Sequence, residues 1–432
     1  MLRITVLGGG FGGLAVCRAL RRADAEIVLV DRQNHHLFQP LLYQVATAGL
    51  GATDIAQPIR SILSKQRNVK VHMAQVTAID LAAKRVRVSE HEDAHDYDYL
   101  VIALGVETNY FGHNEWAYHA PGLKTLHDAT RIRARVLHAF EQAENTADEV
   151  ERKRLLTTVI IGAGPTGVEM AGALVELARF ALRKDFHHIN PADARVVLLE
   201  GGERVLPSFC EEISEKAERT LRQMGVEVHT ATQVENISNG PVVEFGDDRI
   251  EAANAIWAAG IRAPAITETL GVELDKSGRI IVGPDGSIPD HPEVFVIGDI
   301  ASWTDGNGLL VPGLAQGATQ AGRHVGRILA KEIADGPLAS DDRPKFRYYD
   351  KGIMATIGRS KAVVQTKRLR FGGFFAWVAW LLIHILFLVD LRSKLAVIVQ
   401  WMFAYITFRP GARLIYRLET IEKETEEAAE SS

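Results

Sequence analysis

A glycine-rich turn occurs twice in this chain, each time between a short apolar run and an alanine-rich stretch. The first turn spans Gly8 to Gly13 after the run Ile4 to Leu7, and the second spans Gly162 to Gly167 after Val159 to Ile161. Each turn fits G-x-G-x-x-G in the strand, turn and helix context that a dinucleotide-binding fold requires. A single copy is weak evidence, because a glycine turn can serve packing alone. Two copies in this context predict two dinucleotide sites.

The landmark that follows each turn is also repeated. After the first turn, a strand ends in a small residue and glycine at Ile102 to Gly105. After the second turn, a strand ends in the same way at Trp257 to Gly260, and the distance in sequence from turn to strand end is nearly the same. This parallel indicates an internal duplication of a Rossmann-like fold. We therefore expect an α/β chain with two dinucleotide-binding domains. The simplest reason for two dinucleotides in one chain is electron transfer between them.

Each turn has an acidic residue placed to serve it. In this fold the first glycine makes the tight turn, the second admits a pyrophosphate and the third lets the helix pack on the strand, while an acid after the second strand binds ribose hydroxyls. Asp31 fits this role for the first turn and Glu200 for the second. Glu200 lies further from its glycines than the usual spacing of about twenty residues. We attribute the extra length to a longer helix and loop at residues 179–190.

Composition limits the alternatives. A chain of 432 residues holds two or three domains. Its two cysteines, Cys17 and Cys210, are far apart, which disfavours a disulfide framework, a dithiol redox centre and a zinc site, and we expect no metal. The apolar pattern begins almost at residue 1, so we expect no cleavable signal peptide and folding on the cytoplasmic side.

Charge is distributed unevenly along the chain. Residues 351–417 hold eleven Lys and Arg and a single acid, Asp390, whereas residues 418–432 hold six Glu and one Lys and form an acidic tail. A basic block can bind nucleic acid, but here the basic residues flank very apolar segments. We therefore expect contact with a membrane and no nucleic acid.

The apolar segments are residues 371–389 and 395–408. The first has nineteen residues without a formal charge and is long enough to span a bilayer, and the second, with fourteen, is too short. The alternatives are two helices lying in one leaflet, a single span with a return segment, and buried core helices covering a dimer interface. We favour the monotopic pair, because it explains the short second segment and the charges between the two. The aromatic and basic residues expected near headgroups are Trp377, Trp380, Trp401, Tyr405, Lys367, Arg368, Arg370, Arg392, Lys394, Arg409, Arg413 and Arg417.

The domain order follows from these landmarks. We expect the first dinucleotide domain at residues 1–115 and 265–350, with a hairpin-like insertion near residues 69–99, and the second domain, at residues 155–262, inserted into it. Residues 351–417 then form a membrane-anchoring region. Asp299 follows the strand Val294 to Ile297 and precedes a helix that begins near Leu314. An aspartate there can bind the ribityl chain of a flavin, or it can cap a turn.

In these motifs the chain resembles the type II NADH:quinone oxidoreductases, the single-subunit NADH dehydrogenases that do not pump protons. The resemblance extends to about residue 417 and is carried by the apolar tail and by residues 8–14, 31–46, 162–169, 296–299 and 315–320. It implies a glutathione-reductase-like pair of domains with FAD at the first turn and NADH at the second. It also implies a membrane quinone as acceptor and a peripheral homodimer on the cytoplasmic side of the cell inner membrane.

The resemblance also implies roles for particular residues. FAD is held by Gly8, Gly10, Gly13, Asp31 and Asp299, and NADH by Gly162, Gly164, Gly167 and Glu200. Further cofactor-binding positions are Gly12, Arg32, Ala103, Gly105, Ala259, Gly260 and Ala315. The family commonly has Glu where Asp31 stands, and Asp can make the same ribose bonds.

Four residues are candidates for catalytic roles. Glu169 matches an acid close to the nicotinamide and quinone, Gln316 and Gln320 match the quinone-site glutamines, and Lys361 is placed to approach the flavin or quinone. Each also has a structural interpretation: a first-turn carboxylate favourable to the helix dipole, an exposed glutamine pair, and a surface lysine. Gly317 replaces a bulkier family residue, which leaves the shape of the quinone site open.

The implied reaction passes a hydride from NADH to FAD and then two electrons to a quinone. Glu200 is expected to favour NADH over NADPH, because a carboxylate repels a 2′-phosphate, although Arg204 nearby weakens this effect. A sulfide:quinone reductase would need reactive cysteines near the flavin, which Cys17 and Cys210 do not supply. Two further alternatives remain, a soluble NADH-dependent ferredoxin or rubredoxin-type reductase and a non-catalytic NADH-sensing membrane protein.

Overall fold

The computed structural model describes residues 1–89, 94–388, 390–407 and 412–415, and these ranges form two compact units. The first unit comprises Met1–Leu37, Ala56–Glu107 and Ile261–Lys351, and the second comprises Phe38–Ile55, Thr108–Gly260 and Gly352–Ser432. The acidic tail expected at residues 418–432 lies outside the described residues. So do Arg409, Arg417 and the side chain of Tyr405.

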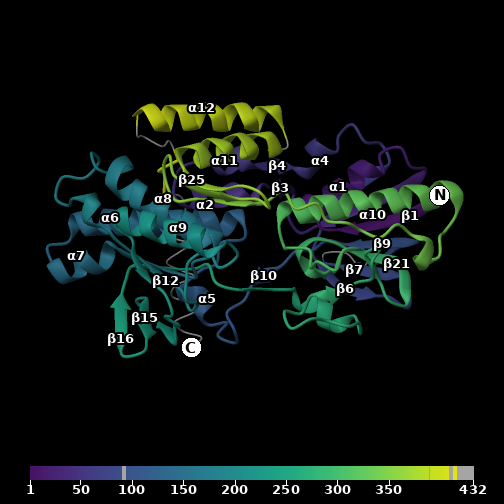
Figure 1. The fold of residues 1–432 in the computed structure, drawn as a ribbon, viewed down its shortest axis with the longest axis horizontal. Helices are drawn as coiled ribbons and strands as arrows, with labels where there is room; N and C mark the ends of the chain where they lie inside the picture. Colours follow the sequence, from purple (N-terminus) through teal and green to yellow (C-terminus); the bar gives the residue numbers. More distant parts are fainter. Residues whose placement is uncertain (90–93, 389, 408–411, 416–432) are drawn as a thin grey trace. The chain divides into compact units, whose positions relative to one another are not determined.

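The first unit is built on a six-stranded sheet of order β20-β21-β9-β1-β2-β5 (Figure 1). Every neighbouring pair is parallel except β20 and β21. The strands are β1 (Leu2–Leu7), β2 (Ala25–Asp31), β5 (Val69–Met73), β9 (Tyr99–Ile102), β20 (Ser287–Ile288) and β21 (His291–Val296). The final strand of this sheet comes from residues that follow the whole second glycine region in the sequence.

One expectation about this sheet is wrong. Val69–Met73, which we placed in a hairpin-like insertion, pairs in parallel with β2 as the edge strand of the main sheet. Because an edge strand is only partly covered, its burial alternates, and such a pattern resembles a hairpin strand. The antiparallel insertion is shorter and consists of β6 (Val76–Asp80), β7 (Arg85–Val88) and β8 (Ala94–Asp96).

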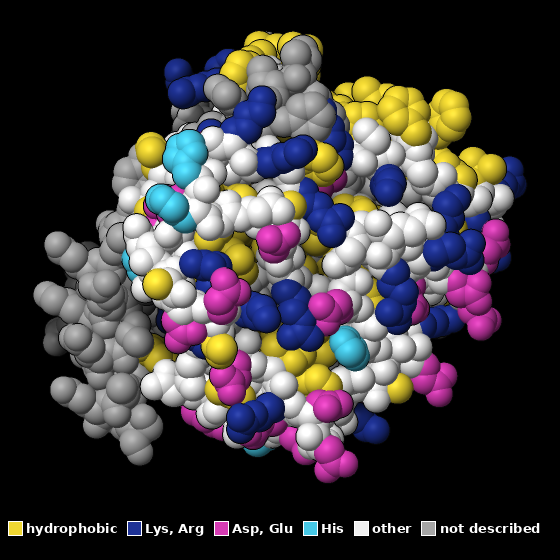
Figure 2. All heavy atoms as spheres, turned by 90° about the vertical axis from the view of Figure 1, so that its left-hand side faces the viewer, with side chains coloured by type: hydrophobic (Ala, Val, Ile, Leu, Met, Phe, Trp, Pro, Cys, Tyr) yellow, Lys and Arg dark blue, Asp and Glu magenta, His cyan; other side chains and the backbone are white. Residues whose placement is uncertain are grey.

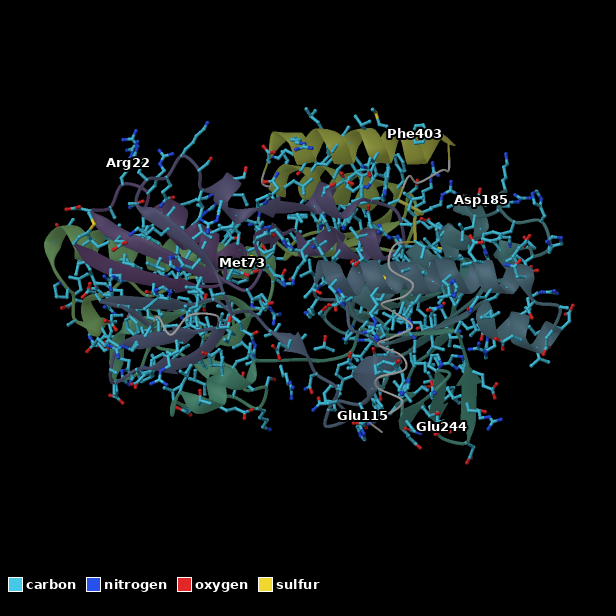
Figure 3. All side chains as sticks on the ribbon, turned by 180° about the vertical axis from the view of Figure 1, so that it is seen from behind. Arg22, Met73, Glu115, Asp185, Glu244 and Phe403 are labelled. Atoms are coloured by element: carbon cyan, nitrogen blue, oxygen red, sulfur yellow. The ribbon has the colours of Figure 1, made fainter. Side chains whose placement is uncertain are left out.

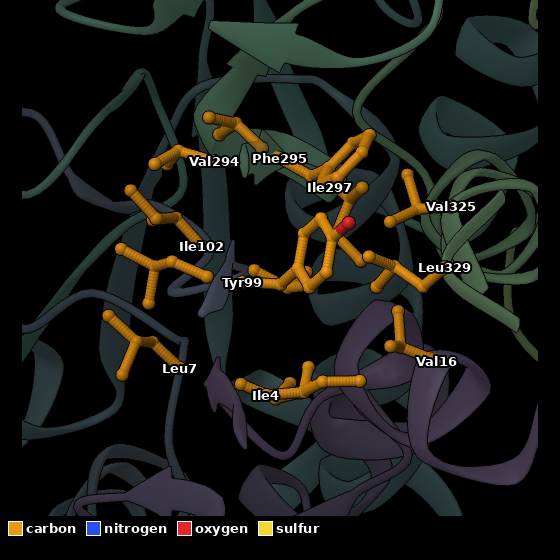
Figure 4. Close-up of a cluster of buried hydrophobic side chains, with 14 of the residues drawn as sticks. Ile4, Leu7, Val16, Tyr99, Ile102, Val294, Phe295, Ile297, Val325 and Leu329 are labelled. Carbon is orange, nitrogen blue, oxygen red and sulfur yellow. The ribbon is translucent and has the colours of Figure 1, made fainter. Parts of the chain in front are cut away.

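The core of the first unit lies between this sheet and two helices, α1 (Phe11–Ala19) and α10 (Ala315–Asp335) (Figure 4). Ile4, Leu7 and Phe295 are fully buried, as is Val325 from α10. Parallel strands covered on both faces read as continuous apolar runs, which explains why Ile4 to Leu7 was recognisable as a strand.

Two glycines let α1 and α10 approach closely. A Cβ at Gly322 would overlap the carbonyl oxygen of Gly12, and a Cβ at Gly326 would lie 2.5 Å from Cβ of Ala19. The loop after α10 is held by a buried ion network. In it Arg343 Nε donates to Glu332 Oε1 at 2.6 Å and Arg343 Nη1 donates to Asp285 Oδ2 at 3.0 Å. Buried charges of this kind are tolerated because each is paired and hydrogen-bonded.

The second unit repeats the same strand order. Its parallel sheet runs β13-β12-β11-β17, which matches β5-β2-β1-β9 of the first unit element by element. The strands and helices are β11 (Thr157–Ile161), α8 (Pro165–Glu176), β12 (Arg195–Leu199), α9 (Glu211–Gln223), β13 (Glu227–His229) and β17 (Asn254–Trp257). The expected duplication and the fold class, two Rossmann-like α/β units, are confirmed.

Other elements of the second unit surround this sheet. An antiparallel sheet joins β14 (Asn236–Ser238), β15 (Val242–Phe245) and β16 (Asp248–Glu251). The helices are α2 (Leu42–Ala46), α3 (Ala52–Ile55), α5 (Trp116–His119), α6 (Leu126–Asn145) and α7 (Glu149–Leu155). The long helix α6 begins with a reciprocal capping box, in which Thr125 Oγ1 accepts from the Asp128 N–H and Asp128 accepts from the Thr125 N–H. Helices α6 and α7 thus form much of the connection that leads to the second glycine turn.

The C-terminal part of the second unit is a strand meander followed by two helices. The meander is β23 (Ile353–Thr356), β24 (Ala362–Gln365) and β25 (Arg370–Gly373), and the helices are α11 (Phe374–Phe387) and α12 (Leu391–Thr407). The apolar run expected at residues 371–389 is thus divided between β25 and α11. Within the described residues, none of the helices combines the length and apolar character needed to cross a bilayer.

The helix pair α11 and α12 is apolar on two sides. Trp380 and Trp401 point inward and are buried, whereas Phe375, Leu386 and Phe403 are at least half exposed. Hydrophobic side chains gather over these helices at the upper edge of the face in Figure 2, and Phe403 lies on the outer surface of α12 in Figure 3. A contiguous apolar patch of this kind marks an interaction surface.

The close approach of α1 and α10 gives a direct test of the packing. Gly322→Ala places a methyl group against the Gly12 carbonyl, and we expect it to lower the free energy of unfolding by about 1–3 kcal/mol, the usual cost of overpacking. The matched control is Gly201→Ala, because a Cβ at Gly201 meets no atom within 4 Å. Urea unfolding of both variants measures the difference, and equal stabilities would contradict the packing described.

Candidate functional site

The first glycine turn joins β1 to α1. Gly8 has φ +103°, and a Cβ there would overlap the carbonyl oxygen of Ala103. A Cβ at Gly13 would overlap the carbonyl oxygen of Gly8. Glycine is therefore required at position 8 by the positive φ and by the close approach of the strand end at Ala103. Glycine is required at position 13 by the contact between the helix and the turn.

The second glycine turn, which joins β11 to α8, has the same geometry. Gly162 has φ +99°, and a Cβ there would lie 2.7 Å from the backbone nitrogen of Ala259. A Cβ at Gly167 would overlap the carbonyl oxygen of Gly162. Ala103 and Ala259, two of the predicted cofactor-binding residues, are thus the strand ends against which the two turns pack.

The middle glycine of each turn differs from its neighbours. Gly10 and Gly164 are the N-cap residues of α1 and α8, and a Cβ at either would meet no protein atom within 4 Å. Neither helix start receives a side-chain cap at this position. Both turns therefore present helix N–H groups and open space on the same side, which fits the pyrophosphate of a bound dinucleotide.

An acid holds each turn in place. Asp31 at the end of β2 accepts a hydrogen bond from Gly9 N–H at 2.6 Å and another from Gln33 N–H at 2.7 Å. Glu200, directly after β12, accepts from Ala163 N–H at 2.6 Å and from Gly202 N–H at 2.8 Å. Burial raises the pKa of Asp31, and the two N–H groups act against this rise. The two acids occupy equivalent positions despite their unequal sequence spacing.

A buried histidine adds support behind the first turn. His36 Nδ1 lies 3.1 Å from the carbonyl oxygen of Gly9, and its ring packs edge-on against Phe11 with the ring centroids 4.9 Å apart. Burial lowers the pKa of His36 to about 4, so the ring is neutral at physiological pH. It acts as a packing and hydrogen-bonding group, which the sequence analysis did not single out.

The other predicted cofactor positions lie close to these turns. Gly105 has φ +70° beyond β9, and Gly260 has φ +73° beyond β17. Gly12 packs against Ile297, from which an added Cβ would lie 3.0 Å. Arg32 Nη1 lies 3.9 Å from Glu107 Oε1 on the surface. These positions are compatible with cofactor contact, and their roles stay predictions.

Asp299 lies in a short 3₁₀ turn, Gly298–Ile300, directly beyond β21. The carboxyl carbon of Asp299 would lie 3.4 Å from a Cβ at Gly313, in the loop that leads into α10. The helix begins at Ala315, one residue after the predicted start, and its first turn carries no acidic residue. Asp299 therefore lies close to the loop that leads into the N-terminus of α10, within the first unit.

The two glutamines of α10 have different surroundings. Gln320 is paired twice with the backbone of Tyr349: its Nε2 donates to the Tyr349 oxygen and its Oε1 accepts from the Tyr349 N–H, both at 3.0 Å. Gln316 is half-buried one turn earlier. Between them, a Cβ at Gly317 would lie 2.8 Å from the Pro312 carbonyl oxygen. The glycine at 317 is thus explained by the tight loop before the helix.

A cavity of about 890 Å³, including its open mouth, lies within the second unit. Helix α8 supplies one wall, the β23–β24 turn another, and α11 and α12 contribute aromatic side chains. The lining residues are Tyr43, Gln44, Thr47, Gly49, Glu169, Ala173, Glu176, Leu177, Phe180, Ala181, Thr356, Gly358, Arg359, Trp377, Trp380, Leu381 and Trp401. The lining is mostly apolar with a few polar groups, which is typical of small-molecule sites.

Glu169 belongs to this cavity, as a catalytic assignment requires. Its Oε1 accepts a hydrogen bond from Thr356 N–H at 3.3 Å. Burial raises the pKa of Glu169 to about 8, and the Thr356 bond acts against the rise. A glutamate with such a pKa holds its proton at neutral pH, which suits a group that gives or takes protons.

A chain of side-chain hydrogen bonds crosses the cavity wall. Tyr43 Oη lies 3.0 Å from Thr356 Oγ1, Gln44 Nε2 donates to Tyr43 Oη at 2.9 Å, and Trp401 Nε1 donates to Gln44 Oε1 at 2.8 Å. It links the meander, α2 and α12 within the second unit. The sequence analysis assigned no role to Tyr43 or Gln44, although both lie in the stretch 31–46 that carried the resemblance.

A second carboxylate of α8 also faces the cavity. Glu176 lies seven residues after Glu169, and its Oε1 accepts a hydrogen bond from Arg359 N–H. Burial raises the pKa of Glu176 to about 7, while Arg359 and Lys361 act against the rise. Lys361, a predicted catalytic residue, lies in the β23–β24 turn, where its charge acts on Glu176. The sequence analysis missed Glu176, although the seven-residue spacing places both acids on one helix face.

Comparisons with known proteins agree with this geometry. The family model for pyridine nucleotide-disulphide oxidoreductases matches residues 2–322. The chain is 43% identical over 420 residues to the type II NADH:quinone oxidoreductase Ndh of Mycobacterium tuberculosis, covering 95% of this chain and 89% of the relative. It is 42% identical to NdhA of the same organism over 94% of this chain and 87% of the relative.

The class of protein is therefore a pyridine nucleotide-disulphide oxidoreductase. Within that class, the chain belongs to the type II NADH:quinone oxidoreductase family. Among solved structures, NDH2 from Plasmodium falciparum in complex with NADH matches with a TM-score of 0.86 at 18% identity, over 95% of this chain and 99% of that one. At that identity the match shows a shared fold.

The two middle glycines give a test that separates binding from folding. Because a Cβ at Gly10 or Gly164 meets open space, Gly10→Ala and Gly164→Ala should fold with stabilities within about 0.5 kcal/mol of the parent. The added methyl groups intrude where a pyrophosphate would lie, so we expect affinity losses of about tenfold to a hundredfold, as a cost of 1–3 kcal/mol produces. Gly10→Ala should lose flavin, measured by visible absorbance, and Gly164→Ala should keep flavin but bind NADH weakly. Retention of both ligands in both variants would contradict the assignment.

Proposed function

We propose that this chain oxidises NADH and reduces a membrane quinone without pumping protons, with FAD at the first glycine turn and NADH at the second. The observation that carries the proposal lies in one helix. Helix α8 begins at the second glycine turn, with Gly164 as its N-cap, and continues along the cavity wall with Glu169 and Glu176. A nucleotide bound at the turn and a substrate bound in the cavity would therefore both contact α8.

The residues present fit the two dinucleotides. Each turn has open space at its middle glycine and uncapped helix N–H groups, which suit a pyrophosphate. Each also has an acid, whose carboxylate oxygen lies 2.6 Å from a backbone nitrogen of the loop and which suits a ribose. Asp299 and the start of α10 are positioned for the remainder of FAD. The chemistry that bound FAD supplies is acceptance of a hydride and release of two electrons.

The chain's own contribution is binding, orientation and proton supply. Oxidation of NADH with reduction of a quinone consumes one proton from the medium, since NADH releases two electrons and a single proton. The protonated carboxyl group of Glu169 on the cavity wall is suited to that supply. The apolar lining formed by Trp377, Trp380 and Leu381 suits a flat hydrophobic quinone ring and its tail.

The exposed face of α11 and α12 supports attachment to a lipid surface. Phe375 is 79% exposed and Leu386 is 69% exposed, and the exposed basic residues Arg370 and Arg392 flank them. Each basic residue near anionic headgroups adds on the order of 1 kcal/mol of attraction. We therefore propose a peripheral, monotopic enzyme on the cytoplasmic side of the inner membrane. A homodimer is part of the same proposal and follows from the family resemblance.

Three alternative functions fit the structure less well. Burial raises the pKa of the Cys17 thiol to about 12, so it cannot serve as the reactive cysteine of a sulfide-oxidising enzyme. A soluble ferredoxin or rubredoxin-type reductase would have no use for the apolar helix pair. A non-catalytic NADH sensor would not require an aromatic-lined cavity beside two buried acids.

Steady-state turnover with a soluble quinone tests the proposal. The purified protein should be yellow, should oxidise NADH with a short-chain quinone, and should give the parallel-line kinetics of a ping-pong reaction. Flotation with anionic vesicles should carry the protein, and neutral vesicles should carry less. A colourless protein, or a yellow one without quinone turnover, would refute the proposed activity.

The nucleotide preference depends on Glu200. Its carboxylate is expected to repel the 2′-phosphate of NADPH, so Glu200→Gln should reduce the ratio of kcat/KM for NADH over NADPH by about tenfold. The amide keeps one acceptor oxygen, which can serve the Ala163 N–H that holds the turn, and it loses the acceptor for the Gly202 N–H. An unchanged ratio would show that another residue, with Arg204 the first candidate, sets the preference.

A further inference from the structure

Two carboxyl groups on one face of α8 open onto the same cavity. Glu169 and Glu176 are separated by seven residues, which is two helical turns or roughly 10 Å along the axis. Each accepts a hydrogen bond from a backbone N–H of the β23–β24 region, Glu169 from Thr356 and Glu176 from Arg359. Glu169 matches a family position, whereas Glu176 has no role in the mechanism so far.

Helix α8 gives the two acids different positions. Glu169 lies in its first half, near the second glycine turn, whereas Glu176 is its last residue. The cavity lining around Glu176 includes Leu177, Phe180 and Ala181 from the segment that follows α8. Glu176 therefore lies two helical turns further from the glycine turn than Glu169, in a part of the lining that includes the half-exposed Phe180.

We propose that Glu176 is a proton donor for the quinone, a catalytic residue beyond those that the family motif indicated. This inference rests on the proposed function. In the step, the O–H bond of the Glu176 carboxyl breaks and an O–H bond to a quinone oxygen forms, and the resulting carboxylate is reprotonated from solvent. The two electrons and the second quinol hydrogen both come from the hydride of NADH, since a hydride consists of one proton and two electrons.

The charged neighbours of Glu176 are consistent with this role. Arg359 and Lys361, from the β23–β24 turn, favour the ionised form, while burial favours the protonated form and brings the pKa to about 7. The group can therefore both lose and regain a proton near neutral pH.

The elements around Glu176 otherwise present mainly uncharged groups. Helix α2 contributes Tyr43 and Gln44, and α11 and α12 contribute tryptophans. The methyl group of Met224, the residue after α9, lies beside Gly358. Glu169, on the same helix, is the other acid of the cavity lining, and its pKa is raised to about 8. Arg413, which donates to the carbonyl oxygen of the lining residue Ala181, pairs with Asp185. The titration of Glu176 should therefore be influenced chiefly by its burial, by Arg359 and by Lys361.

The substitution Glu176→Gln separates proton donation from a structural role. Glutamine keeps an oxygen that accepts from the Arg359 N–H, so the turn remains held, but its amide cannot deliver a proton. We expect kcat with a short-chain quinone at pH 6 to fall by about tenfold to a hundredfold, in line with loss of a general acid. Activity with ferricyanide, which accepts electrons without protons, should be unchanged.

The pH profile gives the second readout. Since the protonated form is the donor, wild-type kcat should fall as pH rises through about 7, and Glu176→Gln should lose this dependence. Glu176→Asp keeps a carboxyl group and should retain part of both the rate and the pH dependence. The control is Glu215→Gln on α9, an exposed glutamate outside the cavity, which should behave as wild type.

Infrared difference spectra provide a readout that does not depend on turnover. A carboxylic acid band that titrates near pH 7 should be present in wild type and in Glu215→Gln and absent in Glu176→Gln. A Glu176→Gln enzyme with wild-type quinone kcat and pH profile would overturn this inference and leave the proposed function intact. A wild-type enzyme that oxidises NADH with neither acceptor would overturn both.

Discussion

A carboxylate that holds a glycine turn is the interaction on which the rest of this structure depends. Asp31 and Glu200 each accept a 2.6 Å hydrogen bond from the residue between the first two glycines of their turn. The bond fixes the end of the second strand against the loop that begins the helix. Because the outer glycines are already in contact with backbone, the space left open at the middle glycine is defined by the protein alone. The space that we propose for the pyrophosphate is therefore shaped by the chain's own backbone contacts.

The second of these turns also positions the cavity. Helix α8 starts at Gly164 and is rigidly placed by the contact of Gly167 with Gly162. Its later turns then bring Glu169 and Glu176 against the β23–β24 region, where backbone N–H groups donate hydrogen bonds to their carboxyl oxygens. The proposed nucleotide turn and the two cavity acids thus depend on the placement of one helix. The burial that raises the pKa values of both acids follows from the same packing.

Features encoded over short stretches were predictable from the sequence. The two turns, the acid after each second strand and the start of α10 all depend on local glycine, charge and apolar patterns. Features that depend on distant residues were not predictable. The bond from Tyr43 to Thr356 joins positions far apart in the chain, and Gln320 pairs with the backbone of Tyr349. Glu176 was recognisable only once the meander was seen to cover α8, and β5 was misread because an edge strand is half covered.

The central claim is that two preformed nucleotide sites in one chain feed electrons to a quinone, and rapid mixing without oxygen tests it most directly. NADH added to the purified protein should bleach the flavin absorbance in a fast phase, and a quinone added next should restore it. The two phases should have the stoichiometry of one NADH and one quinone per chain. A flavin that stays oxidised after NADH, or one that is bleached but not restored by quinone, would contradict the account.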